Sequence, residues 1–314
     1  MRLAFRLLTL ALLPAVMPAF LTACRGSFVP VQSIALPSAT SSRDFAGTDL
    51  LYVSNLGNDT VTVYSYPDGA LQDTLEGFGE PLGLCSDAKG HVYVADYGAG
   101  QIVEFAHGVH KPIRVLRERE GYASACAVNP TSGDLAVTIE QDTGSRSGEV
   151  LVYSHAQGKP AKRIDRSIFY YFFPAYDPNG DLFIDGEDFF NDRVTVAELP
   201  RGKQHFIDLS LDQGIEYPGG MQWDGDRLIV GDQILQAPRM YHFKISGFSG
   251  TRDRTTYFDG ADDVFQFAID GTLVIGGDYR TARENYWNFP GGKRRKTITR
   301  GVSFPEGVTI SRAH

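Results

Sequence analysis

The chain is built largely from short runs in which apolar and polar side chains alternate, separated by turns rich in Gly, Asp and Asn. The clearest example spans residues 81–116, where the runs are 81–87, 91–96, 101–105 and 112–116. Alternation with a period of two is typical of β-strands, and Asp followed by Gly a few residues later is typical of tight hairpin turns. This stretch therefore predicts four consecutive antiparallel strands.

The same four-strand pattern recurs along most of the chain. Copies of its second run begin at Leu51, Val92, Leu135, Leu182, Leu228 and Leu273, which are 41–47 residues apart. A repeat of this length, with four short strands in each copy, is the signature of a β-propeller with one blade per repeat. The sequence predicts an all-β fold of six four-stranded blades over residues 49–314.

The first repeat lacks its innermost strand, because the chain enters it at residue 49 already in the second run. The missing run is found at the other end of the chain, where residues 305–311 align with residues 81–87. We therefore expect the C-terminal strand to complete the N-terminal blade and to close the ring.

Blade two carries a recognisable motif. Pro-x-Gly at 81–83, Asp-x-x-Gly-x-Val-Tyr-Val-Ala-Asp at 87–96 and Gln-Ile-Val-Glu-Phe at 101–105 together resemble an NHL repeat. NHL repeats belong to a broad group of six-bladed propellers that also includes SMP-30/gluconolactonase-like and strictosidine-synthase-like proteins. The resemblance implies the fold, but that fold hosts binding proteins, lactonases and lyases alike.

The N-terminus is predicted to be an export signal. Arg2 and Arg6 precede an apolar run at 7–20, which is short for a membrane-spanning helix. Leu-Thr-Ala-Cys at 21–24 resembles the bacterial lipobox, which implies cleavage after residue 23 and lipidation of Cys24; the alternative is an ordinary secretory signal. Residues 24–48, rich in Ser, Pro and Ala, then form a flexible tether. We expect an exported bacterial protein, held at the cell membrane or the outer membrane through its lipid alone.

Composition narrows the classes of partner. The net charge of −8 provides no basic face for nucleic acid. The expected partner is a protein or a small molecule, and we expect a monomer.

Cys85 and Cys126 lie one register step apart in the repeat, which points them to opposite faces in neighbouring strands. We therefore expect buried free thiols, although an oxidising compartment would permit a disulfide.

Candidate binding residues gather at one mouth of the predicted central channel, where loops enter the innermost strands and leave the second strands. Each second strand ends near an acid or an amide: Asn55, Asp96, Glu140, Glu187, Asp232 and Asp278. The predicted ligand-binding residues at the strand entries are Glu80, Tyr122, Tyr171, Phe172, Tyr217, Asp263 and Glu306. This pattern predicts an acidic, aromatic-lined mouth.

The acidic residues have two interpretations. An Asp or Asn after a strand commonly caps the following turn. Alternatively, carboxylates are the ligands that Ca²⁺ and similar hard cations prefer, and Glu306, Glu80, Asp96 and Asp232 are the candidate ligands here. The gluconolactonase resemblance implies a metal held by one Glu, two Asn and one Asp, but the chain has no paired asparagines in channel-facing positions.

No complete catalytic set is found, because the sequence contains no His-Glu-x-x-His, Gly-x-Ser-x-Gly or phosphate-binding loop motif. The aromatic run 169–173 is interpreted either as core between blades three and four or as a stacking surface at the mouth. Two functions follow. The favoured one is a lipid-anchored, non-enzymatic module that binds a ligand or protein at the channel mouth. The alternative is a divalent-metal-dependent hydrolase or lyase at the same place, with unknown catalytic residues.

Overall fold

The computed structural model describes residues 45, 47–117, 121–142, 147–188 and 193–314. The chain divides into two units, 1–38 and 39–314, and the description below concerns the second. The predicted signal peptide and Cys24 lie outside the described residues. Within them, no helix has the length and apolar character needed to cross a bilayer.

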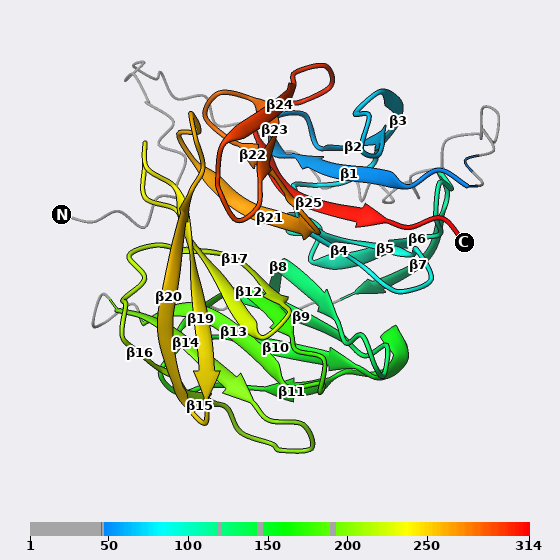
Figure 1. The fold of residues 1–314 in the computed structure, drawn as a ribbon. Coiled ribbons are helices and arrows are strands. Elements are labelled where there is room, and N and C mark those ends of the chain that lie inside the picture. Colours follow the sequence, from blue (N-terminus) through cyan, green and yellow to red (C-terminus); the bar gives the residue numbers. More distant parts are fainter. Residues whose placement is uncertain (1–44, 46, 118–120, 143–146, 189–192) are drawn as a thin grey trace, which may run out of the picture. The chain divides into compact units, whose positions relative to one another are not determined.

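The described chain folds into six antiparallel sheets arranged as the blades of a propeller (Figure 1). Blade one contains β25 (Pro305–Ser311), β1 (Leu50–Asn55), β2 (Thr60–Ser65) and β3 (Leu71–Leu75), and blade two contains β4 (Pro81–Ser86), β5 (Val92–Asp96), β6 (Gln101–Phe105) and β7 (Pro112–Arg117). Blade three contains β8 (Gly121–Val128), β9 (Leu135–Asp142), β10 (Ser147–Tyr153) and β11 (Ala161–Arg163), and blade four contains β12 (Tyr170–Tyr176), β13 (Leu182–Asp188), β14 (Arg193–Leu199) and β15 (Ile207–Asp208). Blade five contains β17 (Pro218–Asp224), β18 (Arg227–Asp232), β19 (Arg239–Ser246), β20 (Ser249–Tyr257) and the added parallel strand β16 (Ser210–Leu211). Blade six contains β21 (Val264–Asp270), β22 (Leu273–Asp278), β23 (Arg283–Asn288) and β24 (Arg294–Ile298).

The ring closes as the sequence predicts. β25 pairs with β1 in antiparallel register from Leu50 opposite Ser311 to Asn55 opposite Pro305. In Figure 1 the red C-terminal strand lies beside the blue N-terminal strand. The six-bladed fold and its closure by the C-terminal strand are both confirmed.

The hydrophobic core is divided into layers between neighbouring blades. Between blades one and two, for example, Tyr52 and Val63 pack against Leu84 and Val94. The second strand of a blade has neighbours on both faces, so every residue of β1 and of β5 is buried. Burial on both faces explains why these second runs are the most apolar part of each repeat.

A β-bulge interrupts the innermost strand of every blade, as in β4, where the register shifts between Pro81 and Leu84. The bulge brings Gly83, the glycine of the Pro-x-Gly motif, against the neighbouring innermost strand, and a Cβ atom there would lie 2.7 Å from Ala125. Gly307 is equivalent, with a Cβ position 2.2 Å from the carbonyl oxygen of Leu82. The motif thus exists because only glycine permits this close approach of backbones.

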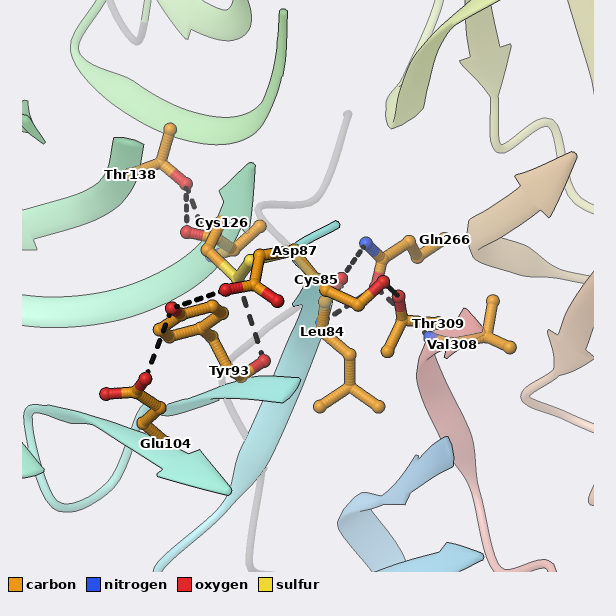
Figure 2. The surroundings of a disulfide bond; sticks show 12 residues. Leu84, Cys85, Asp87, Tyr93, Glu104, Cys126, Thr138, Gln266, Val308 and Thr309 are labelled. Atoms are coloured by element: carbon orange, nitrogen blue, oxygen red, sulfur yellow. Dashed lines mark hydrogen bonds between the residues drawn. A yellow bond between two sulfur atoms is a disulfide. The ribbon is translucent and has the colours of Figure 1, made fainter. Parts of the chain in front are cut away.

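The two core cysteines correct the sequence-based prediction of free thiols, because Cys85 and Cys126 form a disulfide with Cα atoms 5.6 Å apart. Figure 2 shows the bond, which joins β4 and β8, the innermost strands of blades two and three. Side chains on opposite faces cannot meet within one sheet, but β4 and β8 belong to different sheets. Neighbouring blades pack face to face. Side chains that point to opposite faces of their own blades, such as Cys85 and Cys126, can therefore meet between blades two and three.

Candidate functional site

The residues predicted to line the mouth gather at the end of the ring where the chain enters the innermost strands. We call this end the entry face; it comprises the residues just before β25, β4, β8, β12, β17 and β21 and the loops that follow the second strands. Its backbone is held by a hydrogen-bonding pattern that repeats from blade to blade.

The acid or amide that ends the second strand anchors the entry loop. Asp96 Oδ1 accepts the Gly79 N–H at 2.7 Å, and its Oδ2 accepts a bond from the Gln101 side chain at 2.8 Å. The next residue, Tyr97, donates its N–H to the Glu80 carbonyl at 2.9 Å. Burial raises the pKa of Asp96, and these hydrogen bonds oppose the rise by stabilising the carboxylate.

The same arrangement is present in three other blades. Asp232 accepts the N–H of Tyr217 at 3.0 Å, Asp278 accepts that of Asp263 at 3.2 Å, and Asn55 accepts that of Ser303 at 2.8 Å. These side chains therefore cap the loops that enter the innermost strands, whereas the first interpretation of the acidic residues predicted caps on the turns that follow the second strands. Their principal role is to fix the loops that carry the exposed side chains.

Blades three and four depart from this pattern. The capping position is taken by Ile139 and Gly186, and the acids Glu140 and Glu187 follow one residue later. In blade four the fully buried Asp185 accepts the Phe173 N–H at 2.7 Å instead, within the bulge of β12. Residues 118–120, 143–146 and 189–192, next to these strands in the sequence, lie outside the described ranges.

Among the predicted aromatic residues, Tyr217 is the most exposed, at 36%. Tyr122 is half-buried and stacks on Tyr97 with ring centroids 4.9 Å apart, which joins blades two and three. Phe172 is half-buried against the core between blades four and five.

Tyr171 corrects the prediction, because its exposure is 0%. Its hydroxyl group donates to the Asp165 carbonyl at 2.8 Å and accepts the Asp165 N–H at 2.7 Å, within the core between blades three and four. Tyr171 packs in the core between blades three and four, whereas Phe172 packs against the core between blades four and five. Tyr171 belongs to the core.

The predicted acids differ in accessibility. Glu80 is exposed and has a positive φ of 103°, as the residue that turns the chain into β4. Asp263 is buried, and its carboxylate forms an ion pair with the half-exposed Arg280 at 3.3 Å. Glu306 is also buried, at 6% exposure.

The predicted cation ligands are not assembled into a site. Asp96 and Asp232 are engaged as caps in separate blades. In the part of the chain that the structure describes, no three His, Cys, Asp or Glu side chains lie together as metal ligands. Cation binding by Glu306, Glu80, Asp96 and Asp232 therefore stays a prediction that this geometry does not support.

Sequence reasoning missed an aromatic chain that links blades six and one. The ring centroids of Phe265 and Tyr279 are 5.2 Å apart, and those of Tyr279 and Phe304 are also 5.2 Å apart. Phe304 is 45% exposed. Phe304 immediately precedes β25, as Glu80 precedes β4 and Tyr217 precedes β17. Alignment of the residue before each innermost strand would have identified it.

Fold and entry face together define the class of protein: a six-bladed β-propeller whose entry loops are fixed by side-chain caps. The model of the NHL repeat family matches residues 78–105, so at least one blade is an NHL repeat. No match to the sequence of a curated protein was found.

Solved structures support the same architecture. A chain in the crystal structure of a nidogen/laminin complex superposes with a TM-score of 0.68 and 16% sequence identity, covering 85% of this chain and 99% of that one. Altogether 1322 chains of solved structures match. Because one such fold hosts many functions, a likeness at 16% sequence identity shows the fold alone.

Proposed function

We propose that the chain is a lipid-anchored, exported propeller that binds a protein or other ligand, without catalysis, through its entry face. The observation that carries this proposal is the gathering of solvent-accessible aromatic side chains beside carboxylates on that face. Tyr217 and Phe304 are exposed, and the Tyr97–Tyr122 and Phe265–Tyr279 pairs lie partly accessible between them.

This composition suits recognition. Aromatic side chains are enriched at protein interfaces and supply much of the binding free energy, because they bury a large area with few rotatable bonds. The capped loops hold these side chains in place before a partner arrives, which lowers the entropic cost of binding. Propellers that carry NHL repeats are typically protein-binding modules, and the chain that superposes on this one comes from the structure of a nidogen/laminin complex.

The binding face can be tested by capture from an envelope extract of the producing cells. We expect a partner retained by the immobilised wild-type protein to be lost when Tyr217→Ala and Phe304→Ala are combined, because both changes remove exposed aromatic area from the entry face. Phe248→Ala is the matched control, since Phe248 is 43% exposed but lies in the turn between β19 and β20. Equal capture by the double variant would move the binding face elsewhere.

The lipid anchor rests on Cys24 and the preceding Leu-Thr-Ala. The Cys85–Cys126 disulfide supports export, because such bonds persist mainly in oxidising compartments. We expect an alkyne fatty acid fed to the cells to label the wild-type protein and not Cys24→Ser, which should leave the membrane fraction. A Cys24→Ser protein that stays labelled and membrane-bound would contradict the anchor.

A further inference from the structure

A cavity of about 400 Å³ lies at the end of the channel opposite the entry face. This end, where the innermost strands turn into the second strands, is called the hairpin face. The cavity is lined by residues at the last or next-to-last position of the six innermost strands: Ser86, Val128, Tyr176, Trp223, Ile269 and Ile310. Its volume is within the range of small-molecule sites.

On one side of the cavity, side chains already satisfy the edges of the innermost strands. The Gln266 amide bonds to both the N–H and the carbonyl of Leu84, at 2.9 and 2.8 Å, as Figure 2 shows. The Gln222 amide does the same for Ile269, at 2.8 and 3.1 Å. Ser86 donates to the Ile310 carbonyl at 2.8 Å. The side chains of Gln266, Gln222 and Ser86 on this side of the cavity are therefore engaged in hydrogen bonds within the protein.

On the other side, the strand edges of blades three, four and five remain open. In an antiparallel pair, every second residue turns its N–H and C=O away from the partner strand. The N–H groups of Asn129 and Asp177 donate to the carbonyls of Asp134 and Asp181, just before the second strands, at 2.8 and 3.0 Å. The preceding Val128 and Tyr176 therefore turn their backbone groups inward. Trp223 holds the equivalent position in β17. Among the described residues, no partner for these inward-facing groups is found.

The cavity is also electrically neutral. Its one charged lining side chain, Arg312, forms ion pairs with Asp49 and Asp270. The Trp223 ring stacks on Phe183, with the ring centroids 5.3 Å apart, and the residues that line the cavity include the aromatic residues Tyr176, Trp223 and Phe267. A fitting ligand is uncharged, offers both donors and acceptors, and has an apolar face for the indole.

We propose that the hairpin-face cavity binds a neutral mono- or disaccharide. Sugar hydroxyl groups both donate and accept hydrogen bonds, which matches the mixed N–H and C=O groups of β8, β12 and β17. The C–H face of a pyranose ring matches the aromatic wall. This site is independent of the entry-face proposal, because the two lie at opposite ends of the channel.

The two tryptophans of the chain provide the readout, because Trp223 lines the cavity and Trp287 is fully buried. In the complete chain with Trp287→Phe, glucose, N-acetylglucosamine, maltose and cellobiose are titrated, and glucuronate serves as the charged counterpart of glucose. We expect at least one neutral sugar to change Trp223 emission saturably at millimolar concentration or below, and glucuronate to bind at least tenfold more weakly than glucose.

Variants locate the site. Ala127→Leu and Ala268→Leu, on opposite sides of the cavity, should each weaken sugar binding at least tenfold, with thermal melting reporting whether each variant is folded. Tyr217→Ala, on the entry face, should leave sugar binding unchanged. The proposal is overturned if no neutral sugar gives a saturable signal, if folded cavity variants bind as before, or if Tyr217→Ala abolishes binding.

Discussion

Glu284 is a fully buried carboxylic acid in the described fold. It lies in β23 with 0% exposure, and neither carboxyl oxygen has a hydrogen-bond partner among the described residues. Burial raises its pKa well above the usual 4.5. Keeping this carboxyl group neutral in the folded protein costs free energy at every pH at which the unfolded chain would ionise it.

The sign of this effect gives a pH dependence. Above pH 4.5 the unfolded chain releases the proton that the folded chain retains, so stability falls as pH rises from that value toward the folded pKa. We expect Glu284→Gln to stabilise the protein by about 1–3 kcal/mol at pH 8 and to have little effect at pH 4, because the neutral amide has no ionised form to exclude. Urea unfolding at both pH values measures the difference.

The matched control for this prediction is Glu76→Gln, because Glu76 is exposed. It should change stability by less than about 0.5 kcal/mol at either pH. A Glu284→Gln variant that is destabilised equally at pH 4 and pH 8 would contradict a buried, neutral carboxyl group.

Residue roles were predictable where local chemistry decides them. A capping role for Asp96 could be predicted from its position after an apolar strand, but the Gly79 N–H that it accepts belongs to the entry loop and not to the following turn. Tyr171 could not be separated from Phe172, because the register of β12 decides which of two adjacent aromatic residues is buried. Register depends on the bulge, which lies in the tertiary fold.

At the scale of elements, the Cys85–Cys126 bond joins two strands that share no sheet. The cysteines are 41 residues apart, so the cross-link restricts a long loop in the unfolded chain. Loop-closure entropy for this length corresponds to about 4 kcal/mol at 25 °C. We expect Cys85→Ala combined with Cys126→Ala to lower the free energy of unfolding by this order, measured by urea denaturation.

Reductant provides the control for this prediction. It should destabilise the wild-type protein and leave the double variant unchanged. If the denatured, unreduced wild-type protein exposes thiols at both positions to a thiol reagent, the two cysteines are not bridged.

The elements themselves followed from the hydrophobic pattern. Each second strand is buried on both faces between neighbouring blades, so its apolar run is unmistakable in the sequence. The short strands β15 and β16 carry no comparable pattern, because their pairing depends on contacts with β14 and β20. The sequence analysis therefore defined the inner three strands of each blade better than the outer edge.

At the scale of the whole molecule, the ring is joined by contacts between residues far apart in the chain. β25 completes blade one, and Gln266 of blade six reaches Val308 of blade one and Leu84 of blade two. These bonds lie at the wall of the hairpin-face cavity, whose lining includes neither Tyr217 nor Phe304 of the entry face, so ligands at the two places would contact different residues. The two binding proposals can thus be tested separately.

The sequence by itself determined the number of blades, the four-strand plan of each and the closure by the C-terminal strand. These features follow from the alternation of apolar and polar residues within each strand and from the recurrence of the four-strand pattern along the chain. Both signals are local in the sequence. Only the tertiary structure decided that Cys85 and Cys126 meet, that the predicted cation ligands stay apart, and that a cavity forms at the hairpin face. These three features depend on how separate sheets pack face to face around the axis of the propeller. The spacing of residues along one strand does not determine that packing.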